Sequence, residues 1–216
     1  MGIRLRSSHI YVLAGVNGAG KSSVGGTAFR AFGGDYYNPD EVAAAMRRKY
    51  PQLGRSEANA LAWQQGKRLL EQAIARRLDF AFETTLGGNS MVALLERASA
   101  DGIAVYIWYV GLESAELHIE RVQTRVRKGG HSIAEADIRR RYLASRLNLI
   151  HLLPKLTALR IYDNTSEADP DAGAIPKPRL LLHMLNGKLL GPRNLSTTAE
   201  WAKPIVAAAL KLRGQP

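Results

Sequence analysis

The stretch Gly15–Ser22 restricts the fold of this chain more than any other, because it fits the pattern G-x-x-x-x-G-K-[ST]. The apolar run His9–Ala14 precedes it and is typical of a buried strand, while the segment 21–32 is typical of a helix. A strand, a glycine-rich turn and a helix N-terminus form the context in which this pattern holds phosphate. The alternative is an ordinary glycine-rich turn between a strand and a helix.

The residues of this loop suit the phosphate groups of a nucleoside triphosphate. Their backbone N–H groups can surround phosphate oxygens, and the positive end of the following helix points at the same anion. Lys21 is expected to reach the outer phosphates, and the Ser22 hydroxyl is expected to ligate Mg²⁺. We predict ATP and Mg²⁺ as cofactors. The predicted cofactor-binding residues are Gly15, Asn17, Gly18, Ala19, Gly20, Lys21, Ser22 and Ser23.

The composition indicates a single domain over residues 1–216. The hydrophobic content of 46% is enough for one full core at a usual domain size of about 100–200 residues. The chain has no cysteine, which excludes disulfides, thiolate nucleophiles and cysteine-based metal sites. No run approaches the roughly 20 apolar residues that span a bilayer, and the N-terminal apolar stretch is too short for a signal peptide. We expect a soluble, cytoplasmic protein without a membrane partner.

The net charge of +11 indicates an anionic partner. Nucleic acid, nucleotide-sugar phosphates and acidic proteins all satisfy this requirement. The basic residues lack interleaved aromatic residues, and no nucleic-acid-binding motif is present, which favours a small anionic substrate over nucleic acid.

Strand and helix patterns alternate along the chain, which predicts a mainly parallel sheet in a three-layer α/β/α sandwich. The apolar run 103–110 is the strongest strand pattern and suits the centre of such a sheet. Asn186-Gly187 predicts a C-terminal hairpin, which a terminal helix follows. The expected strands cover 9–14, 35–37, 79–85, 103–110, 159–164, 179–184 and 188–190, and the expected helices cover 21–32, 39–50, 56–77, 90–100, 114–128, 134–153 and 197–212.

Three of these helices have residues that favour capping at their start. Asn38 is a predicted N-cap, with proline at the first helical position. Ser56 can cap the helix that runs to about residue 77. Ser132 and Glu135 have the spacing of a capping box.

Polar residues follow several expected strands, at the edge where α/β sheets bind ligands. Asn38 and Asp40 follow the second strand, Glu83 and Thr85 end the third, and Asp163-Asn164 ends the fifth.

Asp40 is the candidate base, because a hydroxyl that attacks the γ-phosphoryl group needs a carboxylate to orient it and accept its proton. An acid favoured by the helix dipole is the alternative for Asp40. Glu83 ends an apolar strand, so a metal, a substrate hydroxyl or a basic neighbour is expected beside it. A plain structural ion pair is the alternative there, and Thr85 can equally cap a turn.

Arginine is concentrated in the segment 114–153, which we interpret as a lid-like helical pair. Arg121, Arg125 and Lys128 fall at i, i+4 and i+7, on one helical face. The next helix carries Arg139, Arg140, Arg141 and Arg146. Arginine that contacts a transferring phosphoryl group is worth about 10³–10⁵ in rate. A solvated basic face is the alternative for any single arginine.

The combination of these motifs resembles the zeta toxin family, and within it the small chromosomal members. The residues that carry the resemblance are Gly15–Ser22, Asn38 with Asp40, Phe82–Thr85, Arg125–His131, Ile138–Tyr142, Asn148-Leu149 and Tyr162–Asn164. The resemblance covers nearly the whole chain. It implies a P-loop kinase that phosphorylates the sugar of a nucleotide sugar such as UDP-N-acetylglucosamine, with an antitoxin protein as a candidate partner.

The resemblance also implies roles for individual residues. Lys21 and Ser22 would hold ATP and Mg²⁺, and Asp40 would activate the sugar hydroxyl. Arg121 and Arg125 would contact the phosphates. The predicted substrate-binding residues are Asn38, Glu83, Thr85 and Arg127. One departure concerns the substrate side: the toxins follow the base closely with a basic residue and His-Pro, whereas here Arg47-Arg48-Lys49 precedes Tyr50-Pro51.

Three other functions stay open at this point. The acceptor could be another small metabolite or the end of a polynucleotide. A regulatory P-loop NTPase is the third, although the chain has no apolar strand that ends in Asp-Glu and no Asn-Lys-x-Asp signature.

Overall fold

The computed structural model describes residues 8–26, 36–130, 132–166 and 178–212. They form a seven-stranded sheet of order β2-β3-β1-β4-β5-β6-β7. The first five strands in this order pair in parallel, and β6 and β7 continue the sheet antiparallel. The strands are β1 His9–Ala14, β2 Tyr36–Tyr37, β3 Phe80–Thr84, β4 Ala104–Gly111, β5 Ala158–Asp163, β6 Arg179–Leu185 and β7 Lys188–Gly191. The predicted mainly parallel sheet and the C-terminal hairpin are confirmed.

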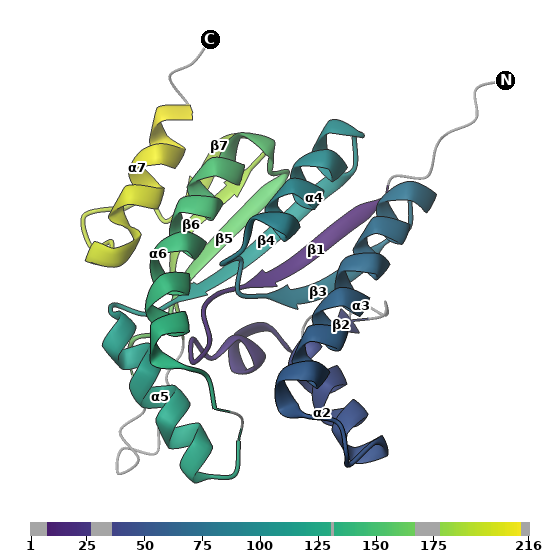
Figure 1. Cartoon of the computed structure of the whole chain (residues 1–216). Helices are drawn as coiled ribbons and strands as arrows, with labels where there is room; N and C mark the ends of the chain where they lie inside the picture. Colours follow the sequence, from purple (N-terminus) through teal and green to yellow (C-terminus); the bar gives the residue numbers. More distant parts are fainter. Residues whose placement is uncertain (1–7, 27–35, 131, 167–177, 213–216) are drawn as a thin grey trace, which may run out of the picture.

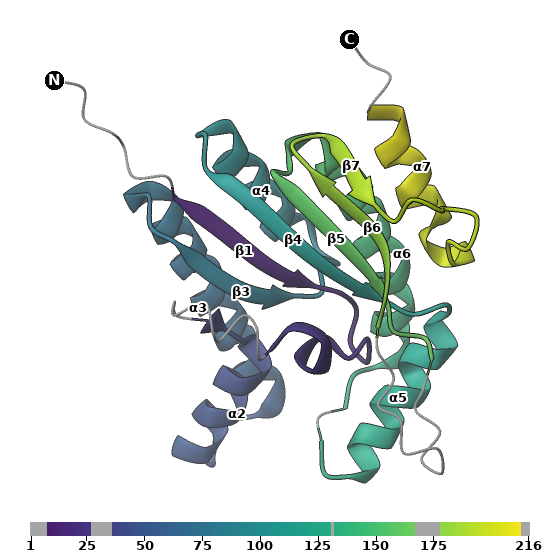
Figure 2. The same cartoon turned by 180° about the vertical axis from the view of Figure 1, so that it is seen from behind.

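Helices cover one face of this sheet. In Figures 1 and 2, α3, α4 and α6 lie together on that face, and α7 packs beside α6. On the opposite face the helical segment among the described residues is the short η1. The helices are η1 Ser22–Gly26, α2 Pro39–Lys49, α3 Arg55–Arg76, α4 Asn89–Ala100, α5 Ala115–Arg127, α6 Glu135–Leu152, η2 Leu153–Lys155, η4 Glu200–Ala202 and α7 Lys203–Leu212.

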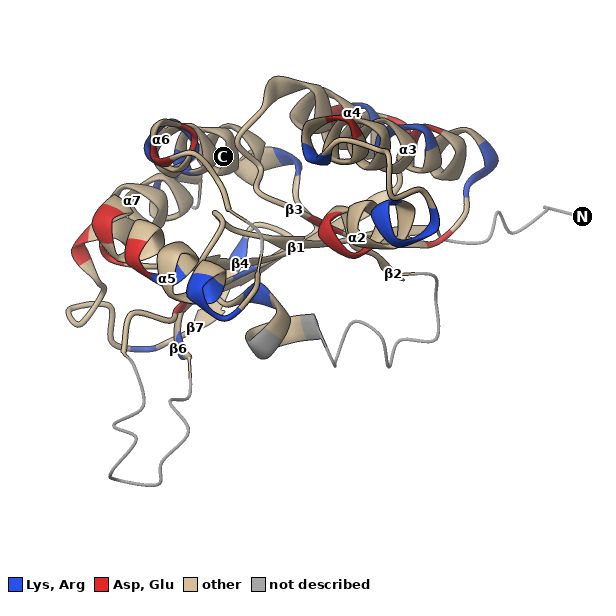
Figure 3. Ribbon diagram, turned by 60° about the horizontal axis from the view of Figure 1, so that its bottom comes forward, with Lys and Arg blue, Asp and Glu red and all other residues tan. Residues whose placement is uncertain are grey.

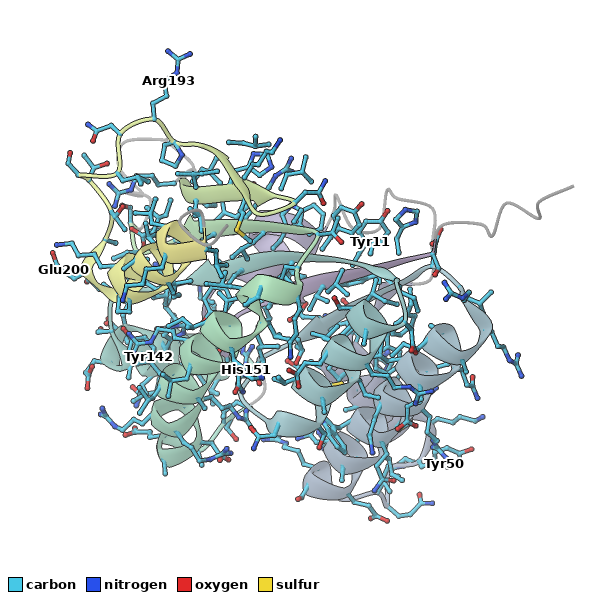
Figure 4. All side chains as sticks on the ribbon, turned by 90° about the horizontal axis from the view of Figure 1, so that it is seen from above. Tyr11, Tyr50, Tyr142, His151, Arg193 and Glu200 are labelled. Carbon is cyan, nitrogen blue, oxygen red and sulfur yellow. The ribbon has the colours of Figure 1, made fainter. Side chains whose placement is uncertain are left out.

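The alternation of side chains along the strands explains the difference between the two faces. On β4, Val105, Ile107 and Tyr109 are fully buried against the helices. Tyr106 and Trp108 point to the other face, where they are half-buried. Tyr11 stacks on Tyr106 there, with ring centroids 5.1 Å apart. Figure 4 shows Tyr11 on the far side of the sheet from Tyr142 and His151, which belong to α6. Each large apolar side chain on the helical face contributes about 1.5–3 kcal/mol by burial.

Two predicted helix starts are wrong in detail. Gly54 is the N-cap of α3, so Ser56 lies inside the helix. Ala134 is the N-cap of α6 and makes no side-chain bond. Glu135 instead accepts a hydrogen bond from a glutamine of α5, and Ser132 accepts one from Arg55. Ser132 and Glu135 thus bond to residues of α3 and α5 and do not form the predicted capping box.

The other predicted boundaries fall close to those of the structure. Asn38 caps α2 by accepting hydrogen bonds from the backbone N–H groups of Asp40 and Glu41, as predicted. Asn186 and Gly187 have φ angles of 48° and 71°, as the predicted tight hairpin turn requires. The terminal helix begins at Lys203 rather than at 197, after the 3-10 turn η4.

Part of the expected helix 21–32 lies beyond residue 26 and outside the described residues, as do the first residue of the strand 35–37 and His131. Within the described ranges, no helix is long and apolar enough to cross a membrane.

Candidate active site

The phosphate loop turns at the carboxyl end of β1, in the middle of the sheet. Its glycines stand where a side chain would collide with neighbouring atoms. Gly15, Gly18 and Gly20 have φ angles of 144°, 84° and 81°. A Cβ at Gly15 would lie 2.2 Å from the carbonyl oxygen of Val110, and one at Gly18 would lie 2.6 Å from that of His118. Both conformation and packing therefore require glycine here.

Residues at the end of β5 and on α5 hold the outer wall of this loop. The amide of Asn164 donates to the carbonyl of Ala19 over 2.9 Å. Arg121 in turn donates to the carbonyls of Asn164 and Thr165, at 2.9 and 3.0 Å. The predicted role of Arg121 was contact with phosphate. The structure gives its guanidinium a bracing position at the edge of the same cavity.

His118 lies beneath the loop and is not among the residues predicted from the sequence. Its side chain is 1% exposed, and its Nδ1 lies 2.9 Å from the carbonyl oxygen of Asn17. Burial, reinforced by the charges of Lys21 and Arg121, lowers the pKa of His118 to about 4, against the effect of the Asn17 hydrogen bond. The ring is therefore neutral at neutral pH and donates its Nδ1 proton to the loop. Its place on the buried face of α5 was the only sequence signal.

Lys21 and Glu83 form a buried ion pair, which provides the basic neighbour expected for Glu83. Lys21 Nζ lies 3.4 Å from Glu83 Oε1, and the two side chains are 8% and 9% exposed. Lys21 also donates to the carbonyl of Gly15 over 2.8 Å. Glu83 Oε2 accepts from the hydroxyl of Tyr36 at 2.7 Å and from the amide of Asn38 at 3.3 Å. The second and third strands are thus tied to the phosphate loop through one carboxylate.

Two cavities meet at this carboxylate. The first, about 450 Å³, lies along the phosphate loop and is called the donor cavity here; the second, about 330 Å³, lies between α2, α3 and β3 and is called the acceptor cavity. Asn17, Asp40 and Glu83 line both of them. The donor cavity is also lined by Gly18, Gly20, Lys21, Ser22, Asn38, Arg121 and Arg125, and the acceptor cavity by Tyr37, Trp63, Phe82, Thr85, Met91 and Arg141.

Most of the predicted site residues are therefore brought together, with two exceptions. Arg127 is exposed, donates to the hydroxyl of Thr124 over 2.8 Å and lines neither cavity. The side chain of Ser23 lies outside the described residues. Arg141, which was not in the predicted set, donates to Asn17 Oδ1 over 2.8 Å and lines the acceptor cavity. Only the packing of α6 against the loop reveals which arginine of its run faces inward.

The donor cavity suits a magnesium ion that a polyphosphate helps to bind. Oxygen-bearing side chains of Ser22, Asp40 and Glu83 line it, and Mg²⁺ prefers such hard oxygen ligands. Among the described residues, no group of three or more His, Asp or Glu side chains could hold a metal. Mg²⁺ commonly takes one or two protein ligands and completes its shell with phosphate oxygens and water.

Comparison with solved structures supports this assignment of fold. The chain is similar to a chain of the AvrRxo1-ORF1:AvrRxo1-ORF2 structure with sulphate ions, with a TM-score of 0.66 and 11% identity over 94% of this chain and 64% of that chain. It is also similar to a structure of the PezAT chromosomal toxin-antitoxin system of Streptococcus pneumoniae, with a TM-score of 0.55 and 12% identity over 96% and 85%. The chain thus spans just under two thirds of the matched chain of the AvrRxo1 complex. At these identities the likeness is one of fold.

The fold and the loop define a P-loop kinase-like protein. The chain belongs to the AAA_33 family of AAA domains, whose family model matches residues 10–146. It is also 32% identical over 132 residues to an uncharacterized protein of Haemophilus influenzae, a match that covers 59% of this chain and 88% of that relative.

Proposed function

We propose that the protein is an ATP-dependent phosphotransferase that transfers the γ-phosphoryl group of ATP to a hydroxyl of a small molecule. The observation that carries this proposal is the junction of the two cavities at Asp40 and Glu83. A kinase must hold a phosphoryl donor and an acceptor hydroxyl on either side of one reacting centre. A regulatory NTPase has no need of a second cavity at that position.

On the donor side, the loop binds the phosphates through its N–H groups, and Lys21 moves from Glu83 to the outer phosphates. Ser22 would hold Mg²⁺, which would supply positive charge to the bound polyphosphate. Arg125 lines the donor cavity, and Arg141 lines the acceptor cavity and donates to Asn17, which lines both. Both are placed to stabilise the charge of the transferring group. Arg127 takes part only if it turns away from Thr124.

On the acceptor side, Asp40 accepts the proton of the attacking hydroxyl. It is exposed and stands in the first turn of α2, where the cap by Asn38 fixes the backbone at Asp40 and Glu41. Glu83, Asn38 and Thr85 surround the acceptor hydroxyl. The Asp40 carboxylate has no hydrogen bond or ion pair among the described residues, so its oxygens are open to a substrate.

The acceptor class follows from the resemblance to zeta toxins, which the shared fold with the PezAT structure supports. We propose a nucleotide sugar such as UDP-N-acetylglucosamine as the acceptor and an antitoxin protein as a partner in a cytoplasmic setting. ATP as the donor agrees with the AvrRxo1-ORF1:ORF2 structure with ATP, which has the same fold. Other small metabolites and polynucleotide ends remain the alternative acceptors.

One experiment tests the reaction and the acceptor together. The protein is incubated with γ-labelled ATP, Mg²⁺ and a panel of UDP-sugars, nucleosides and short RNA. We expect label in a UDP-sugar, and no transfer by the Lys21→Ala variant. Label only in inorganic phosphate would contradict the kinase and favour an NTPase, and label only in RNA would favour a polynucleotide kinase.

A further inference from the structure

A third cavity opens beside Asp40, on the side away from the phosphate loop. It measures about 260 Å³ and lies between α2, α3 and the turn that joins α5 to α6. Arg47 and Arg55 line it, together with Asp40, Asn59 and the glycines of that turn. Figure 3 colours the basic ends of α2 and α5 blue, and Figure 1 shows both helices at the same end of the molecule. We call this space the basic cavity.

The basic cavity adjoins both other cavities at Asp40. It shares Asp40 and Asn59 with the acceptor cavity, and Asp40 and Ala44 with the donor cavity. No residue of the loop Gly15–Ser22 lines the basic cavity. A molecule whose hydroxyl lies at Asp40 can therefore extend in one direction past Trp63 and in the other toward Arg47, away from the phosphate loop.

The two arginines have charge available for a ligand. In the part of the chain that the structure describes, neither guanidinium pairs with a carboxylate. Arg55 donates to the hydroxyl of Ser132 over 3.1 Å, which orients its side chain toward the turn and leaves its charge uncompensated. Arg47 extends from the last turn of α2. Guanidinium groups bind phosphate by paired, charge-assisted hydrogen bonds.

Glycine in the α5–α6 turn keeps the wall of this cavity close to the arginines. Gly129 has a φ of 85°, and a Cβ at Gly130 would lie 2.6 Å from Cγ of Arg125. The turn can therefore lie tightly against α5. The N–H groups of both glycines donate to carbonyls of α5. Recognition in the basic cavity thus depends on Arg47 and Arg55 rather than on the backbone of the turn.

We propose that the basic cavity is an anion subsite for the acceptor, in which Arg47 and Arg55 bind a phosphate or diphosphate group that the acceptor already carries. This proposal rests on the proposed kinase function and assigns the residues that bind the phosphate of a phosphorylated acceptor, a class that includes nucleotide sugars and excludes unphosphorylated nucleosides. The apolar and aromatic lining near Trp63 takes the remainder of the acceptor. The carboxylate of Asp40 repels the anion, so the phosphate occupies the arginine side and the hydroxyl the Asp40 side.

The direct test measures phosphate binding with the donor loop already filled. Wild type and the Arg47→Ala/Arg55→Ala variant are saturated with AMP-PNP and Mg²⁺, and inorganic phosphate is then titrated while its ³¹P line width is followed. Arg48→Ala is the matched control, because Arg48 is an exposed neighbour on α2 that lines none of the three cavities. We expect line broadening in wild type and in the control, and a loss of affinity of about tenfold per arginine in the double variant.

A second measurement uses the acceptor found with the labelled-ATP panel. The double variant should raise the KM for a phosphorylated acceptor and leave the KM for ATP and the folded state unchanged. Equal phosphate binding by wild type and the double variant would overturn the subsite, even if the kinase assay succeeds. If AMP-PNP fails to bind or no acceptor is labelled, the proposed function fails, and the phosphate titration still reports on the basic cavity by itself.

Discussion

The donor and acceptor sides of this site are built in different ways. The donor side is one contiguous loop, Gly15–Ser22, held from below by His118 and from the side by Asn164. The acceptor side is assembled from side chains of α2, α3, β3 and α6, which are far apart in the sequence. A loop with fixed backbone geometry can bind any triphosphate in the same way. A cavity made of separate helices can change its ligand through single side chains.

The donor and acceptor sides also differ in how their charged side chains are buried and paired. On the donor side, the positive charge of Lys21 is buried and compensated by Glu83. On the acceptor side, the charges of Asp40, Arg47 and Arg55 are exposed at the cavity walls. Substitutions on the donor side should therefore alter both stability and catalysis, whereas substitutions on the acceptor side should alter catalysis or acceptor binding alone.

The largest effect is expected for Asp40→Asn. The amide cannot accept the proton of the acceptor hydroxyl, so kcat should fall by about 10²–10⁴. ATP affinity and the melting temperature should stay close to those of wild type, because the side chain is exposed. Steady-state kinetics with the labelled acceptor and ATP titration measure the two quantities. Glu57→Gln, an exposed acid in the first turn of α3, is the control. Wild-type turnover by Asp40→Asn would refute the base assignment.

Lys21→Ala should have the next largest effect, on the donor side. Loss of one charged donor to the transferring group typically costs about 10²–10³ in kcat. Unlike Asp40→Asn, this variant should lose acceptor phosphorylation and any acceptor-independent ATP hydrolysis to the same degree. Both rates are measured with labelled ATP, with Lys49→Ala on α2 as the control. If acceptor phosphorylation persists at the wild-type rate, the phosphate loop is not the donor site.

The same division explains what the sequence could predict. The loop, Asp40 and Glu83 were predictable, because glycine geometry and the polar ends of parallel strands are local features. The bracing role of Arg121 and the inward position of Arg141 depend on how α5 and α6 pack, which no spacing of residues reveals. The role of His118 could not be predicted for the same reason, because its partner is the carbonyl of Asn17, 101 positions away in the sequence.

The failed capping box teaches a related lesson. Ser132 and Glu135 have the correct local spacing, but each makes a bond with a residue of another helix. Tertiary partners of comparable strength replaced a weak local preference. The bond of Ser132 orients Arg55, which lines the basic cavity.

His118→Asn should change how the free energy of unfolding depends on pH, without the large loss of turnover expected for Asp40→Asn and Lys21→Ala. The pKa of His118 falls from 6.5 in the unfolded chain to about 4 in the folded one. Above pH 6.5 the His118 ring is neutral in both the folded and the unfolded chain, so it does not make the free energy of unfolding depend on pH. Between pH 6.5 and 4 the unfolded chain binds a proton that the folded chain does not, so stability falls on acidification by about 3 kcal/mol in total.

The measurement compares urea unfolding of wild type and His118→Asn at pH 7.5, 6 and 4.5. The variant should lose this part of the acid destabilisation while still donating a hydrogen bond toward Asn17. His151→Asn is the control, because His151 is exposed and pairs with Glu96 at the surface. Parallel pH profiles for wild type and His118→Asn would show that this ring does not couple the loop to pH.

Glu83→Gln should change stability by an amount that depends on ATP, and it separates the two sides most directly. The amide can still accept from Tyr36, but it no longer compensates the charge of Lys21. We expect a loss of about 3 kcal/mol in the free energy of unfolding, at the low end of the usual cost of removing one partner of a buried ion pair, because Lys21 keeps its hydrogen bond to the Gly15 carbonyl. ATP with Mg²⁺ should restore part of this loss, because phosphate oxygens then take the place of the carboxylate beside Lys21. Thermal unfolding with and without ATP measures both.

Glu96→Gln provides the matched comparison for this variant. Glu96 also accepts from a basic pair, His151 and Lys155, but it does so at the surface, where an ion pair contributes under about 1 kcal/mol. The stability lost in Glu96→Gln should be small, and ATP should not change it. If both variants lose the same stability, or if ATP rescues neither, the buried pair of Lys21 and Glu83 does not link the folded state to the donor site. If Glu83→Gln alone loses more stability, and ATP restores part of that loss, then the Glu83 carboxylate links the stability of the fold to phosphate binding.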